Sequence, residues 1–150
     1  MVESDAPEKY DEKNIFMKII RGEATAHRVY EDEDTIAIMD VMPHCTGHVL
    51  VLPKAPARNI FDATQDTLCK VIPVVQKIAI ACKKALQADG IKIMQFNEVS
   101  ASQTVFHLHF HIIPCKGECG NDFHHKKTKV EDFQTLELTA KKIRKELEIS

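Results

Sequence analysis

The sequence predicts an α+β fold, in which an antiparallel sheet of about five strands packs against one long helix. Three observations carry this prediction. Two strand-like segments, 28–31 and 35–40, flank an acidic turn, an apolar segment spans 48–53, and apolar residues recur at helical spacing through 64–88. The strand-like segments cluster instead of alternating with helices, which favours an antiparallel sheet over parallel βαβ units.

The N-terminal region predicts an arm followed by a short helix. Residues 1–13 are acidic and polar with almost no apolar periodicity, so we expect a flexible arm. Asn14 suits a helix cap, the apolar residues that follow it form one stripe, and Gly22 is a stop signal. We therefore expect a helix over 15–21 with one buried face.

The next region predicts a hairpin and a central strand. The acidic turn 32–34 joins two segments rich in Val, Tyr and Ile, and Pro43 ends the second of them. Residues 48–53 are apolar except for the histidine at the entrance, which is typical of a strand buried on both faces. We expect this segment in the middle of the sheet.

The main helix is predicted over 64–88, where Asp89-Gly90 closes the periodic pattern. Pro73 lies inside the pattern and either kinks the helix or begins a second helical piece, and the sequence leaves both open. Two further strands are predicted over 91–96 and 104–113, joined by a polar loop.

The chain is expected to form one domain. Its 150 residues, 44% of them hydrophobic, suffice for a single core. We assign residues 14–150 to this domain, with a core over 14–114 and a C-terminal extension over 115–150. The extension contains an amphipathic helix over 131–147, whose role the sequence does not indicate.

Composition excludes several classes of function. A formal net charge of −2 provides no positive field for nonspecific nucleic-acid binding. No segment approaches the roughly 18 apolar residues that span a bilayer, and the polar N-terminus is unlike a secretory signal, so we expect a cytoplasmic protein without a membrane partner. The five scattered cysteines suit reduced thiols better than a disulfide framework.

The most informative segment is His107-Leu108-His109-Phe110-His111. On a strand, alternation would place the three imidazoles on one face, roughly 6.5 to 7 Å apart from one to the next. A solvated polar face would not require histidine at all three positions. A zinc site and a site for a phosphate chain are both compatible with this row.

The surroundings of the row favour phosphate. Residues 97–104 are rich in neutral hydrogen-bond donors, which a phosphate needs and a zinc ion does not, and His48 enters a neighbouring strand as a fourth imidazole. No carboxylate lies near the row in sequence. The middle histidine, His109, suits the role of nucleophile, because its neighbours can fix its tautomer.

These residues resemble the histidine triad (HIT) superfamily of nucleotide hydrolases and transferases, whose signature alternates three histidines with apolar residues. Further similar blocks follow the family order across about residues 14–114: they are 14–23, 38–43, 47–54 and 103–106. The opening block favours the Hint-like branch of purine nucleoside phosphoramidases over the Fhit-like branch of dinucleoside polyphosphate hydrolases.

The resemblance implies a HIT-like fold, a homodimer with a sheet extended across both subunits, and a pocket for a purine nucleotide (an AMP or GMP moiety). It implies that His109 attacks the α-phosphorus, that His107 and His111 orient it and bind phosphate oxygens, and that His48 completes the catalytic set. It implies no metal and no cofactor. The substrate-binding positions that it implies are Asp40 for the ribose, Phe16, Ile19 and Ile38 for the base, and Asn97, Gln103 and Thr104 for the phosphate and leaving group.

The sequence departs from the family pattern in one loop. Relatives usually place glycines before Gln103, whereas residues 99–102 are Val-Ser-Ala-Ser, which restricts the backbone and leaves phosphate binding to Ser100 or Ser102. The Cys-x-x-Cys zinc ligands of some bacterial relatives are absent, so we expect no zinc near the first helix. A second zinc hypothesis concerns Cys115, Cys119, His124 and His125, whose spacing is irregular.

Three functions remain under consideration. The first is a hydrolase that cleaves purine nucleoside 5′-phosphoramidates or acyl-nucleotides through a nucleotidyl-histidine intermediate. The second is a related nucleotide protein, either a dinucleoside polyphosphate hydrolase or a nucleotide-binding protein without turnover. The third is a three-histidine zinc protein.

Overall fold

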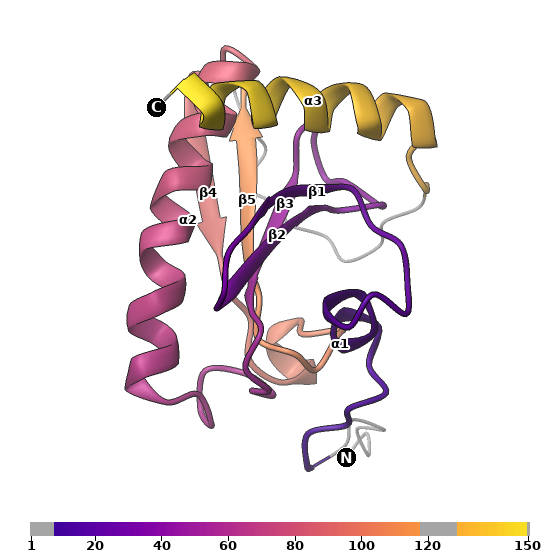
Figure 1. Cartoon of the computed structure of the whole chain (residues 1–150), viewed down its shortest axis with the longest axis vertical. Helices are drawn as coiled ribbons and strands as arrows, with labels where there is room; N and C mark the ends of the chain where they lie inside the picture. Colours follow the sequence, from indigo (N-terminus) through magenta and orange to yellow (C-terminus); the bar gives the residue numbers. More distant parts are fainter. Residues whose placement is uncertain (1–7, 118–128, 150) are drawn as a thin grey trace.

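A computed structural model describes residues 8–117 and 129–149, and within them one five-stranded sheet carries the molecule (Figure 1). The sheet order is β1-β2-β3-β5-β4, and every neighbouring pair is antiparallel. In chain order the elements are α1 Ile15–Ile20, β1 Arg28–Glu31, β2 Thr35–Met39, β3 Val49–Pro53, α2 Gln65–Ala85, β4 Gly90–Met94, the 3₁₀ turn η1 Val99–Ala101, β5 Phe110–Cys115 and α3 Phe133–Ile149. The predicted α+β class is confirmed.

The sheet has apolar cover on both faces. On one face Val49 and Val51 of β3 belong to a core shared with α2 and α3, and on the other Leu50 and Leu52 pack with Phe16 of α1. Figure 1 shows α2 beside the sheet, with α3 and α1 toward opposite ends of the molecule. Burial on two faces explains why β3 reads as a continuous apolar run, as predicted.

Helix α2 is a single helix that contains Pro73. Thr64 caps its start by accepting a hydrogen bond from the Thr67 backbone N–H. Pro73 leaves the carbonyl of Cys69 without its usual helical donor, but both residues lie on the exposed side, where water can hydrate that carbonyl. Of the two alternatives left open by the sequence, a second helical piece is therefore not formed.

The strand predicted over 104–113 is shorter than expected, because β5 begins only at Phe110. Strand β3 pairs with β5 at Val51↔Phe110, and two residues further along β3 stands Pro53, which has no N–H to extend the ladder. The backbone N–H of Leu108 donates instead to Ala57 O at 2.8 Å. The segment before Phe110 therefore lacks sheet pairing.

The cysteines differ in part from expectation. Cys45, Cys69 and Cys82 are free thiols, and Cys82 is buried in the core, where desolvation raises its pKa to about 12. Cys115, however, is disulfide-bonded, so the expectation of reduced thiols is wrong for that residue.

The predicted arm over 1–13 is described only in its second half, because residues 1–7 lie outside the described residues. Residues 8–13 make defined contacts instead of behaving as an independent tail: Glu12 pairs with Arg21 at 3.2 Å, and the Tyr10 hydroxyl contacts His107. No helix among the described residues is long and apolar enough to cross a bilayer.

Helix α3 is joined to the edge of the sheet by polar contacts. The Glu137 carboxylate accepts hydrogen bonds from His27 Nδ1 and from Arg144, both at 2.7 Å. Arg144 Nε also donates to the Arg28 carbonyl at 2.6 Å, which ties the helix to β1. The hydrogen bonds from Arg144 and His27 lower the pKa of Glu137 to about 2.

Replacement of Glu137 by Gln tests this junction. The pKa of Glu137 lies below its usual 4.5, so the carboxylate stabilises the fold fully above pH 4.5, and this contribution is lost as the pH falls toward 2. We expect Glu137→Gln to lower the free energy of unfolding at pH 7 by about 1–2 kcal/mol, given partial solvent screening. Urea unfolding at pH 7, 4.5 and 3 should show the difference from wild type shrinking. Glu148→Gln, on the exposed side of α3, is the control, and an equal loss there would contradict the assignment.

Candidate active site

A cavity of about 460 Å³ lies between α1, the end of β2 and the segment that leads into β5. Two of the predicted catalytic histidines, His109 and His111, line this cavity. The predicted binding residues Phe16, Ile19, Ile38, Asp40, Ser102 and Thr104 also line it. Residues scattered over most of the chain therefore meet at one site.

Sequence reasoning missed part of the cavity wall. The wall also contains Ile15, Thr25, Ala26, Met39, Val41, Met42, Leu50 and Val105. Val41 and Met42 directly follow Asp40 and remain substantially exposed, so an apolar pair after a buried carboxylate was a usable signal. Thr25 and Ala26 lie in an irregular connection that carries no periodic pattern.

The hydrogen bonds of His48 and His111 determine their tautomers. The backbone N–H of His44 donates to His48 Nδ1 at 3.0 Å, so that nitrogen carries no proton. Nε2–H of His48 must then donate to His111 Nδ1, 2.9 Å away. Neutral His111 therefore carries its proton on Nε2. This ring lines the cavity and can offer an N–H donor there.

His109 has the opposite tautomer. Its Nδ1 lies 2.6 Å from the backbone carbonyl of His107, which can only accept, so the proton is on Nδ1. In the neutral ring the lone pair is consequently on Nε2, the nitrogen that a nucleophile would use. Phe16 packs edge-on against this imidazole at a centroid distance of 4.8 Å.

His107 lies behind the cavity and does not line it. Its Nε2–H donates to Pro53 O at 2.8 Å, and its Nδ1 accepts from the Tyr10 hydroxyl at 2.6 Å. Because the ring is fully buried, its pKa is lowered to about 4, and it is neutral at pH 7. Direct binding of phosphate oxygens, implied for His107 by the resemblance, is not supported by these contacts, since both nitrogens are bonded inside the protein.

Asn97 and Gln103 are also bonded within the protein. Gln103 is buried, and its amide donates to the carbonyls of Arg58 and Val105 and accepts from the Glu98 N–H. The Asn97 side chain exchanges hydrogen bonds with Gln95 and accepts from the Ile60 N–H. Neither lines the cavity, so both organise the loop rather than present donors to a ligand.

A metal site fits these histidines poorly. Asp40, His48 and His111 offer ligand atoms within 4.8 Å of one another, the one such buried group found among the described residues. Metal binding through His48 Nε2 would place its proton on Nδ1, where it would face the His44 N–H donor. Of the second zinc hypothesis, Cys119, His124 and His125 lie outside the described residues, and Cys115 is disulfide-bonded.

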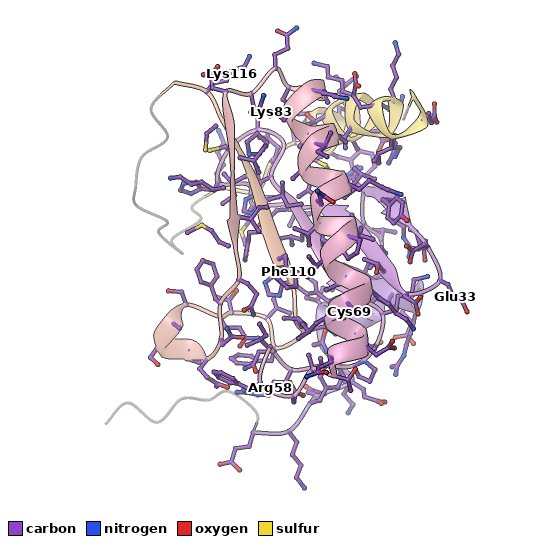
Figure 2. All side chains as sticks on the ribbon, turned by 90° about the vertical axis from the view of Figure 1, so that its left-hand side faces the viewer. Glu33, Arg58, Cys69, Lys83, Phe110 and Lys116 are labelled. Atoms are coloured by element: carbon purple, nitrogen blue, oxygen red, sulfur yellow. The ribbon has the colours of Figure 1, made fainter. Side chains whose placement is uncertain are left out.

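The glycine-free loop beside the cavity has a strained backbone. Glu98 has φ 79° and ψ 160°, a region that is nearly exclusive to glycine, and Ser102 has φ 83°. The Glu98 carboxylate receives both arms of the Arg58 guanidinium, which holds the pKa of Glu98 below its usual value, and Arg58 stacks on Phe106. Figure 2 shows Arg58 at the same end of the molecule as the loop with η1. This ion pair holds the strained loop in place.

Glycine at position 102 should relieve part of this strain. We expect Ser102→Gly to raise the free energy of unfolding by about 1 kcal/mol and Ser102→Val to lower it by at least as much, because φ is positive there. The control is Ser100→Gly, within η1 and without a positive φ, which should destabilise by roughly 0.5–1 kcal/mol. Urea unfolding measures all three. Destabilisation by Ser102→Gly equal to that of Ser100→Gly would contradict the strain.

Comparisons with known proteins identify the family of this chain. The HIT domain family model matches residues 21–118. A solved HIT-like protein from Bartonella henselae, described as involved in cell-cycle regulation, has 52% identity and a TM-score of 0.85, over 92% of this chain and 99% of that one. The Bacillus subtilis protein named hit is 36% identical over 131 residues, which cover 83% of this chain and 90% of that protein.

A further relative carries a named activity. An adenosine 5′-monophosphoramidase from Candida albicans is 31% identical over 137 residues, which cover 89% of this chain and 90% of that enzyme. The family model covers well over half of the chain and includes the buried histidines around the cavity. The chain belongs to the HIT domain family of nucleotide-binding proteins and hydrolases.

Proposed function

We propose that this protein cleaves purine nucleoside 5′-phosphoramidates or acyl-nucleotides at the α-phosphate and releases the nucleoside monophosphate. The observation that carries the proposal is the tautomer of His109: Nδ1–H is bonded to the His107 carbonyl, which leaves the lone pair on Nε2 of a ring that lines the cavity. A neutral imidazole held in this way is a nucleophile that needs no metal.

The cavity has the polarity that a nucleoside monophosphate requires. The cavity has an apolar wall against which a base can stack, formed by Phe16, Ile19 and Ile38. The Asp40 carboxylate, which also lines the cavity, can accept hydrogen bonds from ribose hydroxyls. One carboxylate oxygen of Asp40 accepts from the Met42 N–H at 2.9 Å, which fixes its orientation.

The proposed reaction has two steps. His109 Nε2 attacks the α-phosphorus, a P–N bond to the ring forms, and the bond from phosphorus to the leaving amine or acylate breaks, the amine departing with a proton taken from solvent. Water then attacks the same phosphorus and loses a proton to solvent, the electron pair of the P–N bond returns to His109 Nε2, and nucleoside monophosphate leaves. The Nε2–H of His111 can donate to a nonbridging oxygen in both steps, and His48 holds that ring in the required tautomer.

The activity of the Candida albicans relative, an adenosine 5′-monophosphoramidase, supports this substrate class. We also propose a homodimer in which the sheet continues across two subunits. Strand β4 is an outer strand of the sheet, and Ile93 on it is 51% exposed, as expected for an edge that a second copy could cover.

A second candidate function is nucleotide binding without turnover. The observation that favours it is the loop before the triad: Gln103 and Asn97 are bonded within the protein, and the strained Glu98 and Ser102 restrict the approach of backbone donors to a phosphate. A dinucleoside polyphosphate hydrolase would use the same nucleophile with a different leaving group.

Removal of the nucleophile separates these functions. Metal-free wild type, kept with a chelator, should hydrolyse adenosine 5′-phosphoramidate faster than diadenosine polyphosphate, and His109→Ala should lower kcat by about three orders of magnitude or more. AMP affinity, measured by calorimetry, should change by less than about threefold, because the base and ribose contacts remain. His27→Gln is the control, because the His27 side chain contacts Glu137 on α3 and does not line the cavity. Tight AMP binding by an inactive wild type would favour the second candidate, and activity only with added zinc would overturn the mechanism.

The role of Asp40 has its own test. We expect Asp40→Asn to reduce kcat/KM for adenosine 5′-phosphoramidate by about tenfold, because a charged acceptor for the ribose hydroxyls is lost. For the 2′,3′-dideoxy analogue of this substrate, which lacks those hydroxyls, kcat/KM should stay nearly unchanged. Steady-state kinetics with both substrates and both proteins form a double-mutant cycle. Equal losses on the two substrates would contradict a contact between Asp40 and the sugar.

A further inference from the structure

Tyr10 touches the histidine row from outside the region that matches the family model. That model begins at residue 21, and the sequence pattern places Tyr10 in an acidic segment with no periodicity. Yet its hydroxyl lies 2.6 Å from Nδ1 of His107, and the two rings meet edge-on at a centroid distance of 5.7 Å. An N-terminal side chain is thus part of the wall behind the catalytic cavity.

The contact completes the hydrogen bonding of a fully buried ring. His107 Nε2–H is committed to the Pro53 carbonyl, so its Nδ1 is an acceptor that must find a donor inside the protein. Tyr10 is that donor. With both nitrogens bonded, the ring can neither flip nor change tautomer without breaking a buried hydrogen bond.

The orientation of His107 matters because its own carbonyl holds the proposed nucleophile. Nδ1–H of His109 donates to that carbonyl at 2.6 Å. Both residues precede β5, so no ladder hydrogen bonds hold this stretch of backbone. Its position depends on a few separate contacts: the Leu108 N–H on Ala57 O, the Gln103 amide on Val105 O, and the two bonds of the His107 ring.

We propose that Tyr10 is a positioning residue for His109, which acts through His107: its hydroxyl locks the His107 ring, and the locked residue presents the carbonyl that fixes the nucleophile's tautomer and direction. The inference rests on the proposed function. It adds to that function a component supplied by the N-terminal segment, which lies outside the residues matched by the family model.

Tyr10→Phe tests the hydroxyl alone, because the ring and its edge contact with His107 remain. The matched control is Tyr30→Phe, which removes the other tyrosine hydroxyl of the chain, a donor to Asp32 at 2.7 Å in the β1–β2 turn. With adenosine 5′-phosphoramidate, we expect Tyr10→Phe to lower kcat about tenfold and to change KM and AMP affinity less than about twofold, since the cavity wall is intact. Tyr30→Phe should leave kcat at the wild-type value.

A spectroscopic measurement reports on the same contact without turnover. Long-range ¹H–¹⁵N correlation spectra assign the tautomer of each histidine ring and detect hydrogen bonding at its unprotonated nitrogen. In Tyr10→Phe we expect the Nδ1 resonance of His107 to move to the position of a nitrogen without a donor, and the His109 resonances to shift or broaden. Tyr30→Phe should change neither.

The outcomes separate this inference from the proposed function. If wild type turns over the phosphoramidate and Tyr10→Phe keeps the wild-type kcat, the inference is overturned even where the protein is less stable. If wild type has no turnover, the proposed function fails, and the ring resonances decide: displaced His109 signals in Tyr10→Phe support the positioning role, and unchanged His109 signals overturn it.

Discussion

Buried imidazoles must have partners for both ring nitrogens, and this requirement organises the candidate site. His48 and His107 are wholly shielded from water, so each donates once and accepts once within the protein. These two residues in turn determine the tautomers of the other two histidines. His48 sets the tautomer of His111, and the His107 carbonyl sets that of His109. The two rings that line the cavity therefore differ at Nε2: this nitrogen carries a lone pair in His109 and a proton in His111.

Neutrality is part of the same arrangement. Burial lowers the pKa of His107 to about 4. The His107 ring behind the cavity therefore stays uncharged at pH 7. The chain as a whole has a formal net charge of −2 and provides no broad positive field for an anionic ligand.

Local patterns predicted what depends on local physics. The hairpin of β1 and β2, the doubly buried β3 and the long α2 followed from periodicity and turn residues, because each buries a face that its own spacing defines. The predicted start of β5 was wrong because it depends on Pro53 in another strand. The contact of Tyr10 with His107 could not be predicted, because a single aromatic residue in a polar segment forms no periodic pattern. The hydrogen bonds of Gln103 could not be predicted either, because they depend on the path of the loop.

By itself the sequence determined the fold class, the family and the residue types at the site: an alternation of histidines with Leu108 and Phe110 specifies which side chains face the core and which face away. Only the tertiary structure decided which histidine lines the cavity, which one lies behind it and which nitrogen carries each proton. Those properties depend on donors and acceptors from distant segments, such as Tyr10, Pro53 and His44, and no spacing within the triad encodes where they lie.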